Sequence, residues 1–125
     1  MASTPSFSID VDEDSRQWLE QREQTGCGAR SSGVLDAIRH FGSRDRIFYV
    51  HFRDVQGGID DFTECFLGDG NCDPVETIRT LKDVGFRGFL IPDHVPQMEG
   101  DEGWNHRGRA WTVGYIRGLL DAVSG

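Results

Sequence analysis

The sequence predicts an α/β protein with parallel strands, organised as a partial barrel of the (β/α) TIM type. Helix-like and strand-like segments alternate along the chain, which is typical of parallel α/β folds. Two apolar segments, 47–52 and 86–91, each lead into polar residues, as strands do where a barrel presents its site. A complete eight-stranded barrel takes about 250 residues. The chain has 125 residues, so we expect a fragment or a reduced form of the fold.

The composition fits a soluble globular protein and excludes two classes of partner. The formal net charge is −8, whereas nucleic-acid binding requires a basic patch, so we expect no nucleic-acid partner. No apolar run reaches the roughly 20 residues of a membrane span, and no secretory signal is visible, so we expect no membrane partner. Three cysteines without such a signal favour reduced thiols and a cytoplasmic location.

The first 24 residues are polar and acidic, and we expect them to form a loosely ordered segment separate from residues 25–125. A short helix is expected at about 15–24. The next residues, TGCGARSS, form a Gly/Ser turn that contains Cys27. A helix follows, with Ser32 as its expected N-cap and Gly42 as its stop.

The strand at 47–52 is apolar on both faces, as buried parallel strands are. The chain then breaks at Gln-Gly-Gly, and a short strand is expected at 62–66. Asp-Pro-Val-Glu at 73–76 is a strong helix start, with an Asp N-cap, Pro at the first position and Glu at the third. Gly85 ends that helix. Its inner apolar stripe is Val75, Ile78, Leu81 and Val84.

The last part of the chain predicts a strand, a loop and a helix. The strand at 86–91 is followed by a Gly-rich, acidic loop that runs to about residue 105. A final helix is expected at about 107–123. The residues that it should bury are Ala110, Val113, Ile116, Leu120 and Val123.

Three candidate metal ligands lie at or near the ends of proposed strands. Cys27, His51 and Asp93 together offer a thiolate, an imidazole and a carboxylate, which suit a divalent metal. Each also has an ordinary structural explanation: a small buried thiol, a hydrogen-bonded core histidine and a turn-capping aspartate. His94 beside Asp93 favours the functional interpretation, because a turn needs only one of the two residues.

A second group of polar residues could contact a substrate. Arg53 follows His51 on the same face of its strand and could clamp a carboxylate, or form an ion pair with a neighbouring acid. Glu64 lies on the short strand, where it faces either the mouth of the barrel or water. Arg107 and Arg109 open the last helix, where cations oppose the helix dipole, so we expect anion binding there.

Taken in order, these residues resemble a known family. VHFRDV, FTECFLGDGNCD, GFRGFLIPDHVP and GW…HRGRAWTVGYIRGLL are similar to the C-terminal part of mannonate dehydratase, over about residues 26–123. The family is a metal-dependent barrel related to the xylose isomerase-like fold, and it converts D-mannonate to 2-keto-3-deoxy-D-gluconate and water in sugar-acid catabolism. The resemblance implies roughly the last three to four βα units of such a barrel, a hydro-lyase activity and Mn²⁺, or Fe²⁺, as cofactor.

The resemblance also implies roles for particular residues. Cys27, His51 and Asp93 match the family's metal ligands, and His94 matches its catalytic histidine. Trp104 stands where some members have a catalytic tyrosine, and an indole cannot exchange a proton in that way. The residues assigned to substrate binding are Arg53, Glu64 and Arg109.

Three interpretations stay open. The first is a mannonate dehydratase, or a piece of one. The second is a truncated, non-catalytic remnant, or a fragment that requires a partner chain, because the half of the barrel that brings a further histidine ligand has no counterpart in this sequence. The third is a metal-dependent sugar isomerase or epimerase on the same kind of barrel. The sequence leaves the oligomeric state open, a homo-oligomer included.

Overall fold

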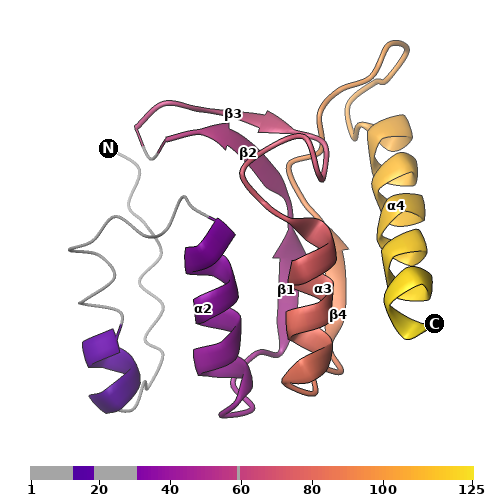
Figure 1. The fold of residues 1–125 in the computed structure, drawn as a ribbon. Coiled ribbons are helices and arrows are strands. Elements are labelled where there is room, and N and C mark those ends of the chain that lie inside the picture. The colour runs from indigo at the N-terminus through magenta and orange to yellow at the C-terminus, as the bar shows by residue number, and fades with distance from the viewer. Residues whose placement is uncertain (1–12, 19–30, 59) are drawn as a thin grey trace.

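The structure is a computed structural model that describes residues 13–18, 31–58 and 60–125 (Figure 1). The described part is a mixed α/β fold. Residues 13–18 form a short helix, so the helix predicted at 15–24 is described only in part. The other elements, in chain order, are α2 (Ser31–Gly42), β1 (Tyr49–Phe52), β2 (Asp54–Gly57), β3 (Phe62–Cys65), α3 (Pro74–Asp83), β4 (Phe89–Pro92) and α4 (His106–Ser124).

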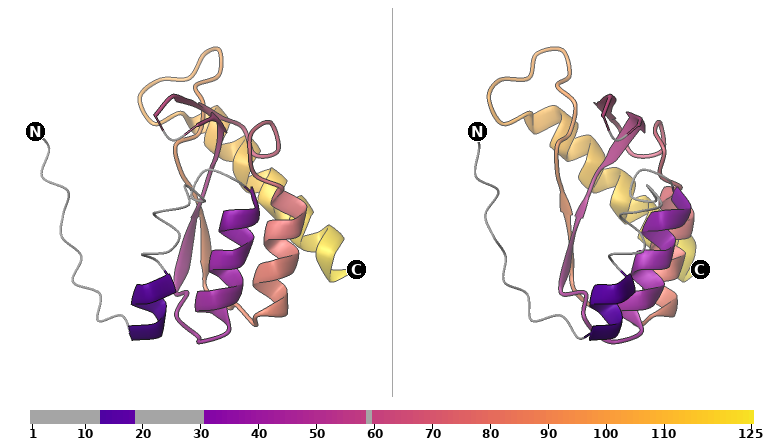
Figure 2. Two further views of the ribbon diagram at one scale, coloured as in Figure 1. Left: turned by 60° about the vertical axis from the view of Figure 1, so that its left-hand side comes forward. Right: turned by 90° about the vertical axis from the view of Figure 1, so that its left-hand side faces the viewer.

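Strands β1 and β4 pair in parallel, as predicted, although each is shorter than the apolar segment that contains it. The register pairs Tyr49 with Phe89 and Phe52 with Pro92. The two strands are far apart in the sequence, and α3 lies in the connection between them. Figure 2 shows α2 and α3 on one side of this sheet. The core lies between the strands and the helices and consists of Ile38, Phe52, Leu67, Ile78, Leu81, Ile116 and Leu119.

The opposite face of the β1–β4 sheet is open among the described residues. Tyr49 is 58% exposed, Phe89 is 79% exposed and Ile91 is 38% exposed. The prediction that the first strand is buried on both faces is therefore wrong for the described part of the chain. Side chains alternate between the faces of a strand, and the described helices cover one face only.

A hairpin of β2 and β3 follows β1 directly. The two strands are antiparallel, with Asp54 opposite Cys65 and Gly57 opposite Phe62. The sequence predicted the second strand but a simple break in place of the first, which is a correction. Strand β2 is Asp-Val-Gln-Gly, so its pairing depends on backbone hydrogen bonds and on the Asp54 carboxylate rather than on an apolar pattern.

That carboxylate organises the whole loop after the hairpin. Asp54 is 3% exposed, and its two oxygens accept hydrogen bonds from four backbone amides at 2.9–3.1 Å. The donors are the amides of Val55, Gly68, Gly70 and Cys72. The loop therefore reaches α3 along a fixed path, and the hairpin is held at the end of β1.

Helix α3 forms as its sequence predicts. The Asp73 side chain caps it by accepting a hydrogen bond from the Glu76 amide at 3.0 Å, and Pro74 occupies the first turn. Ile78 and Leu81 are buried, and the other two residues of the predicted stripe are half-buried against the core. The helix ends just before Gly85, which takes the left-handed conformation with φ +76°.

Two predictions about the other helices need correction. Helix α2 ends at Gly42, as expected, but it already includes Ser31, so Ser32 lies inside the helix and is not its N-cap. In α4 the predicted buried set was Ala110, Val113, Ile116, Leu120 and Val123. Of these only Ile116 is buried, Val123 is half-buried, and the other three are exposed.

Two of the four residues that α4 buries, Gly108 and Thr112, are small or polar. Its buried residues are Gly108, Thr112, Ile116 and Leu119. A Cβ on Gly108 would lie 2.5 Å from the Pro96 carbonyl oxygen, so only glycine lets the helix approach that loop. Thr112 is 2% exposed and satisfies its hydroxyl by donating to the Gly108 carbonyl at 2.8 Å. A search for apolar spacing misses Gly108 and Thr112, and so it places the buried face of the helix wrongly.

Candidate functional site

The parallel pairing of β1 and β4 brings two candidate metal ligands together. His51 pairs with Ile91 in the register, so Asp93, two residues further, lies on the same face of the sheet, just past the strand end. The His51 Nδ1 atom lies 3.2 Å from the Asp93 Oδ2 atom. The two side chains are 53% and 30% exposed, so both are open to a ligand.

His94 adjoins the same pair. Its Nε2 atom lies 3.6 Å from Asp93 Oδ2, and its backbone amide donates to Asp93 Oδ1 at 3.0 Å. The backbone at His94 is left-handed, with φ +46°. That conformation is uncommon outside glycine and is often kept where function requires it. It turns the imidazole, which is 54% exposed, toward the hairpin.

The hairpin contributes Glu64 and links it to Arg53. The Glu64 Oε1 atom lies 3.4 Å from His94 Nδ1 and accepts a hydrogen bond from Arg53 NH1 at 2.9 Å. The ion-pair interpretation of Arg53 is thus the one that the structure shows. The other oxygen of Glu64, Oε2, is buried and has no hydrogen-bond partner among the described residues. A buried oxygen without a partner is uncommon in a folded protein.

These five residues form one connected cluster, which we call the strand-end cluster: His51, Arg53, Glu64, Asp93 and His94. Arg109 reaches its edge from α4. Its NH1 atom donates to the Pro92 carbonyl at 3.2 Å, and its Nε atom donates to the Trp104 carbonyl at 2.8 Å. Arg109 therefore ties the start of α4 to the end of β4. Its assignment to substrate binding stays a prediction, as do those of Arg53 and Glu64.

Two of the three predicted metal ligands, His51 and Asp93, lie in the described part of the chain. Cys27 lies outside the described residues. Within the described ranges, no group of three or more His, Cys, Asp and Glu side chains is arranged to hold a metal ion. His51 and Asp93 offer one imidazole nitrogen and one carboxylate, donors that suit Mn²⁺ and Fe²⁺. These two side chains therefore fit the predicted metal and leave its other ligands to be supplied from elsewhere.

The loop before α4 depends on a carboxylate that the sequence did not single out. Asp101 is 8% exposed and accepts hydrogen bonds from the amides of Met98 at 2.9 Å, Arg107 at 2.7 Å and Gly108 at 3.3 Å. Burial raises the pKa of Asp101, but these amides lower it by more, and the net shift is downward. In the sequence Asp101 is simply one of several acids in a Gly-rich loop.

Trp104 projects from the same loop and is 75% exposed. Its indole lies in water, and its carbonyl is the group that Arg109 binds. A proton-transfer role at this position is therefore excluded by the chemistry of the side chain.

The two cysteines in the described part are free thiols. Burial, reinforced by nearby carboxylates, raises the pKa of Cys65. Burial also raises the pKa of Cys72, against a hydrogen bond with Thr77 that lowers it. Both thiols are therefore protonated at neutral pH and poorly suited to bind metal or act as nucleophiles.

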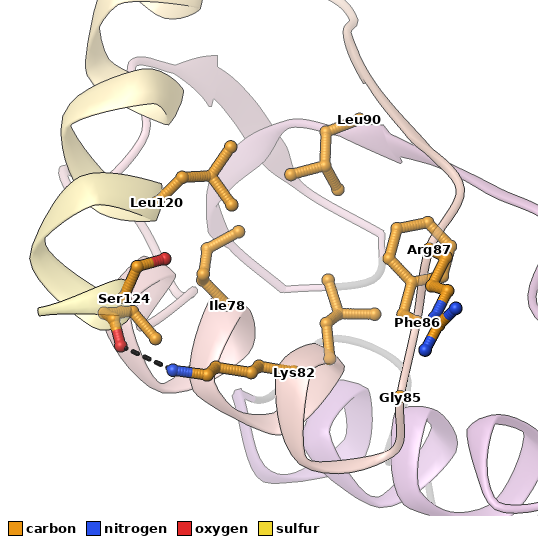
Figure 3. Close-up of a pocket in the computed structure, with 10 residues that line it drawn as sticks. Ile78, Lys82, Gly85, Phe86, Arg87, Leu90, Leu120 and Ser124 are labelled. Carbon is orange, nitrogen blue, oxygen red and sulfur yellow. Dashed lines mark hydrogen bonds between the residues drawn. The ribbon is translucent and has the colours of Figure 1, made fainter.

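A separate pocket of about 370 Å³ lies between α3 and α4, near residues 85–87, which precede β4. Figure 3 shows Ile78, Leu90 and Leu120 around it, with Lys82 donating to the Val123 carbonyl at its rim. None of the predicted site residues lines it, because the strand-end cluster lies past the other end of β4. We therefore assign it no part in the site.

Among the described residues, every helix lacks the length or the hydrophobicity that a membrane-spanning segment requires.

Comparison with known proteins places this arrangement in a family. The family model of D-mannonate dehydratase (UxuA) matches residues 24–125. Mannonate dehydratase 2 of Halalkalibacterium halodurans is 35% identical over 104 residues, which cover 78% of this chain and 30% of that protein. Mannonate dehydratase of Thermotoga neapolitana is 30% identical over 99 residues, which cover 74% of this chain and 28% of that protein.

A solved structure agrees with these relatives. The crystal structure of mannonate dehydratase from Streptococcus suis matches with a TM-score of 0.65 and 28% identity. The match covers 71% of this chain and 27% of that protein. The chain thus spans less than a third of the length of the relatives that it matches. The matched family model and these relatives together show that the chain belongs to the D-mannonate dehydratase (UxuA) family.

Proposed function

We propose that the chain forms the strand-end part of a mannonate dehydratase site, which removes water from D-mannonate to give 2-keto-3-deoxy-D-gluconate. The observation that carries the proposal is the 3.2 Å approach of His51 and Asp93, with His94 adjoining, in a member of this family. Apart from the inserted β2–β3 hairpin, the order β1, α3, β4, α4 is the repeat from which a (β/α) barrel is built. We therefore assign residues 25–125 to the last units of a partial barrel.

The proposed cofactor is Mn²⁺ or Fe²⁺. His51, Asp93 and Cys27 would hold it, the first two through the atoms that face each other past the strand ends. When bound, such an ion supplies Lewis acidity that makes the proton next to the sugar-acid carboxylate easier to remove.

The other residues of the strand-end cluster have separate tasks in this proposal. Dehydration takes a proton from the carbon beside the carboxylate and gives one to the leaving hydroxyl. His94 performs one of these transfers, and the carboxylates of Glu64 and Asp93 on its two sides fix its orientation. Arg53 and Arg109 provide positive charge for the substrate carboxylate.

The second proton-transfer group has no occupant among the described residues. The proposal that the chain acts only together with further polypeptide is therefore the main alternative. Two observations favour it: the open face of the β1–β4 sheet, and a match that covers less than a third of each relative. The two free thiols of the described part agree with a reducing, cytoplasmic setting.

The first test is metal binding, because it does not require turnover. We expect the purified chain to retain Mn²⁺ after gel filtration, as measured by elemental analysis, and His51→Gln to lose it. His106→Gln is the matched control, since His106 is an exposed histidine outside the strand-end cluster. Equal metal retention in His51→Gln and the wild type would contradict the proposed site.

The second test follows 2-keto-3-deoxygluconate formed from D-mannonate in the presence of Mn²⁺. We expect product that disappears with a chelator. His94→Gln is expected to keep the metal and to lower the rate by at least about 100-fold, as the loss of a general acid or base does. Failure of the folded, metal-loaded chain to form product would show that the chain alone is not the enzyme.

A further inference from the structure

Helix α4 contacts two of the segments that carry the strand-end cluster. Near the start of the helix, Arg109 donates to the Pro92 carbonyl, two residues before His94. Trp111, two residues further along the helix, contacts the loop that follows the β2–β3 hairpin. The hairpin carries Glu64, and the end of β4 carries His94, so one helix touches the supports of both residues.

Three aromatic rings make the contact between α4 and the hairpin loop. The ring centroids of Phe66 and Trp111 are 4.8 Å apart with an interplanar angle of 64°, an edge-to-face arrangement. Those of Trp111 and Tyr115 are 4.9 Å apart at 16°, a stacked arrangement. The loop also approaches Tyr115 at Gly68, where an added Cβ would lie 2.9 Å from the tyrosine hydroxyl oxygen. We call these three rings the aromatic clamp, and Trp111 is the ring that contacts both of the others.

The hairpin depends on such a contact for a fixed position. In the described part of the chain, β2 and β3 pair only with each other and form a sheet separate from β1 and β4. A two-stranded sheet is marginally stable by itself. The amides that bind Asp54 all belong to residues 55–72, so that carboxylate holds the hairpin to its own loop and not to β4. The aromatic clamp joins this loop to α4, which Arg109 in turn joins to the end of β4.

The position of the hairpin decides the contact between Glu64 and His94. Glu64 lies two residues before Phe66, and its Oε1 atom is 3.4 Å from His94 Nδ1. This distance is at the outer limit for a hydrogen bond, so a small movement of the hairpin away from β4 would break the contact. A hydrogen bond from Nδ1–H to Glu64 leaves Nε2 as the nitrogen that can take up a proton.

We propose that Trp111 is a positioning residue of the site, which fixes the hairpin so that Glu64 holds the His94 ring in one tautomer and orientation. Trp111 acts through Glu64 and is assigned no contact with substrate or metal. The proposal rests on the proposed function for the task of His94, whereas the effect of Trp111 on the His94 ring can be measured without turnover. If the clamp only stabilised the fold, the loss of Trp111 would leave that ring unchanged.

The first test observes the His94 ring by NMR. The chain is labelled with ¹⁵N at histidine and measured without added metal at about pH 8, where an ordinary imidazole is neutral. The ring nitrogen shifts report the tautomer, and His94→Gln identifies the His94 signals. We expect Trp111→Ala to change these shifts in the same direction as Glu64→Ala. Trp111→Phe should retain most of the wild-type shifts, because a phenyl ring can still contact Phe66.

Val113→Ala is the matched control. Val113 lies on α4 two residues from Trp111, and both side chains are 41% exposed. We expect this control to leave the His94 shifts unchanged. Amide hydrogen exchange in residues 54–57 and 62–65 should become about tenfold faster in Trp111→Ala and should change less than about twofold in Val113→Ala. Leu67 stays in the core in both variants, so we expect both to remain folded by circular dichroism.

The second test measures turnover of D-mannonate by the manganese-loaded chain. We expect Trp111→Ala to lower kcat about tenfold, with KM and manganese retention within about twofold of the wild type. The double variant Trp111→Ala/Glu64→Ala should be no slower than Glu64→Ala alone, because a residue that acts through another has no effect once that other residue is gone.

Three results would overturn the proposal. The first is wild-type His94 shifts in a folded Trp111→Ala variant. The second is an equal change of these shifts in Trp111→Ala and Val113→Ala, and the third is additive losses of kcat in the double variant. A wild-type chain that binds Mn²⁺ and forms no product would count against the proposed function alone, and the His94 shifts would still decide the role of Trp111.

Discussion

Two pairs of carboxylates in this molecule differ in their exposure to solvent and in the groups that they contact. Asp54 and Asp101 are nearly inaccessible, at 3% and 8% exposure, and their oxygens accept hydrogen bonds from several backbone amides each. The side chains of Asp93 and Glu64 are about 30% exposed and face imidazole and guanidinium groups instead. Asp54 and Asp101 supply acceptors for loop amides that would otherwise be buried without a partner. Asp93 and Glu64 lie where a ligand can approach them.

The comparison separates stability from function. A buried carboxylate that holds several amides cannot be replaced without leaving those donors unsatisfied. A half-exposed carboxylate in an ion pair contributes little to stability. Substitutions at the first pair should therefore change the free energy of unfolding, and substitutions at the second pair should change ligand binding.

Asp54→Ala is expected to have the largest effect. It removes the acceptor of four amides, and we expect the free energy of unfolding to fall by about 3 kcal/mol or more. Urea denaturation followed by circular dichroism measures this. The control is Asp69→Ala, an exposed aspartate in the same loop, which should change it by less than about 0.5 kcal/mol. Equal effects of the two substitutions would refute the anchoring role of Asp54.

Gly70→Ala tests the same anchor from the side of the loop. A Cβ on Gly70 would lie 2.4 Å from the Val55 carbonyl oxygen and 2.6 Å from Asp54 Oδ1. Because the clashing atoms belong to the backbone and to a fixed carboxylate, we expect a loss of about 1–3 kcal/mol in urea denaturation. Gly118→Ala meets no atom within 4 Å and should instead stabilise α4, by up to about 1 kcal/mol. If Gly70→Ala left the free energy of unfolding unchanged, the loop would be able to shift and make room for the added Cβ.

Asp101→Asn should produce a pH-dependent loss of stability. The folded protein lowers the pKa of Asp101, so the ionised carboxylate stabilises the fold above the ordinary pKa of an aspartate, near 3.9. This contribution is lost as the pH falls through the lowered value. The wild type should therefore melt higher than Asp101→Asn at pH 7, and the difference should begin to narrow as the pH falls below about 4. Thermal melts across this range measure it, with Glu102→Gln, an exposed neighbour, as control. A difference that does not narrow as the pH falls below about 4 would contradict the assignment.

The sequence predicts those elements whose determinants lie close together along the chain, and it misses those that depend on distant residues. All the determinants of α3 lie within about ten residues: the Asp73 cap, Pro74 and the apolar stripe. Strand β2 depends on amides 14–18 residues away, at Gly68, Gly70 and Cys72, which no local pattern reveals. The buried face of α4 depends on the contact of Gly108 with Pro96, and such a contact follows from the folded path of the loop.

The candidate site also has features that could be predicted from the sequence and features that could not. Parallel strands bring their carboxyl ends together, so the approach of His51 to Asp93 could be predicted from two apolar segments that each end in polar residues. The partner of Arg53 could not be predicted, because the sequence contains several neighbouring acids. Only the folded hairpin places Glu64 beside Arg53. The unpartnered oxygen of Glu64 is likewise visible only in the folded chain.

Asp93→Asn is expected to have the smallest effect on stability and a full effect on ligand binding. The side chains of Asp93 and His51 are 30% and 53% exposed, so water replaces the lost contact, and the free energy of unfolding should change by less than about 0.5 kcal/mol. Manganese retention should be lost, because an amide oxygen is a much weaker ligand than a carboxylate. Asp121→Asn, an exposed aspartate on α4, is the control for both measurements. If Asp93→Asn instead destabilises the chain as much as Asp54→Ala, then Asp93 is a structural anchor, and the division between buried and open carboxylates no longer marks the site.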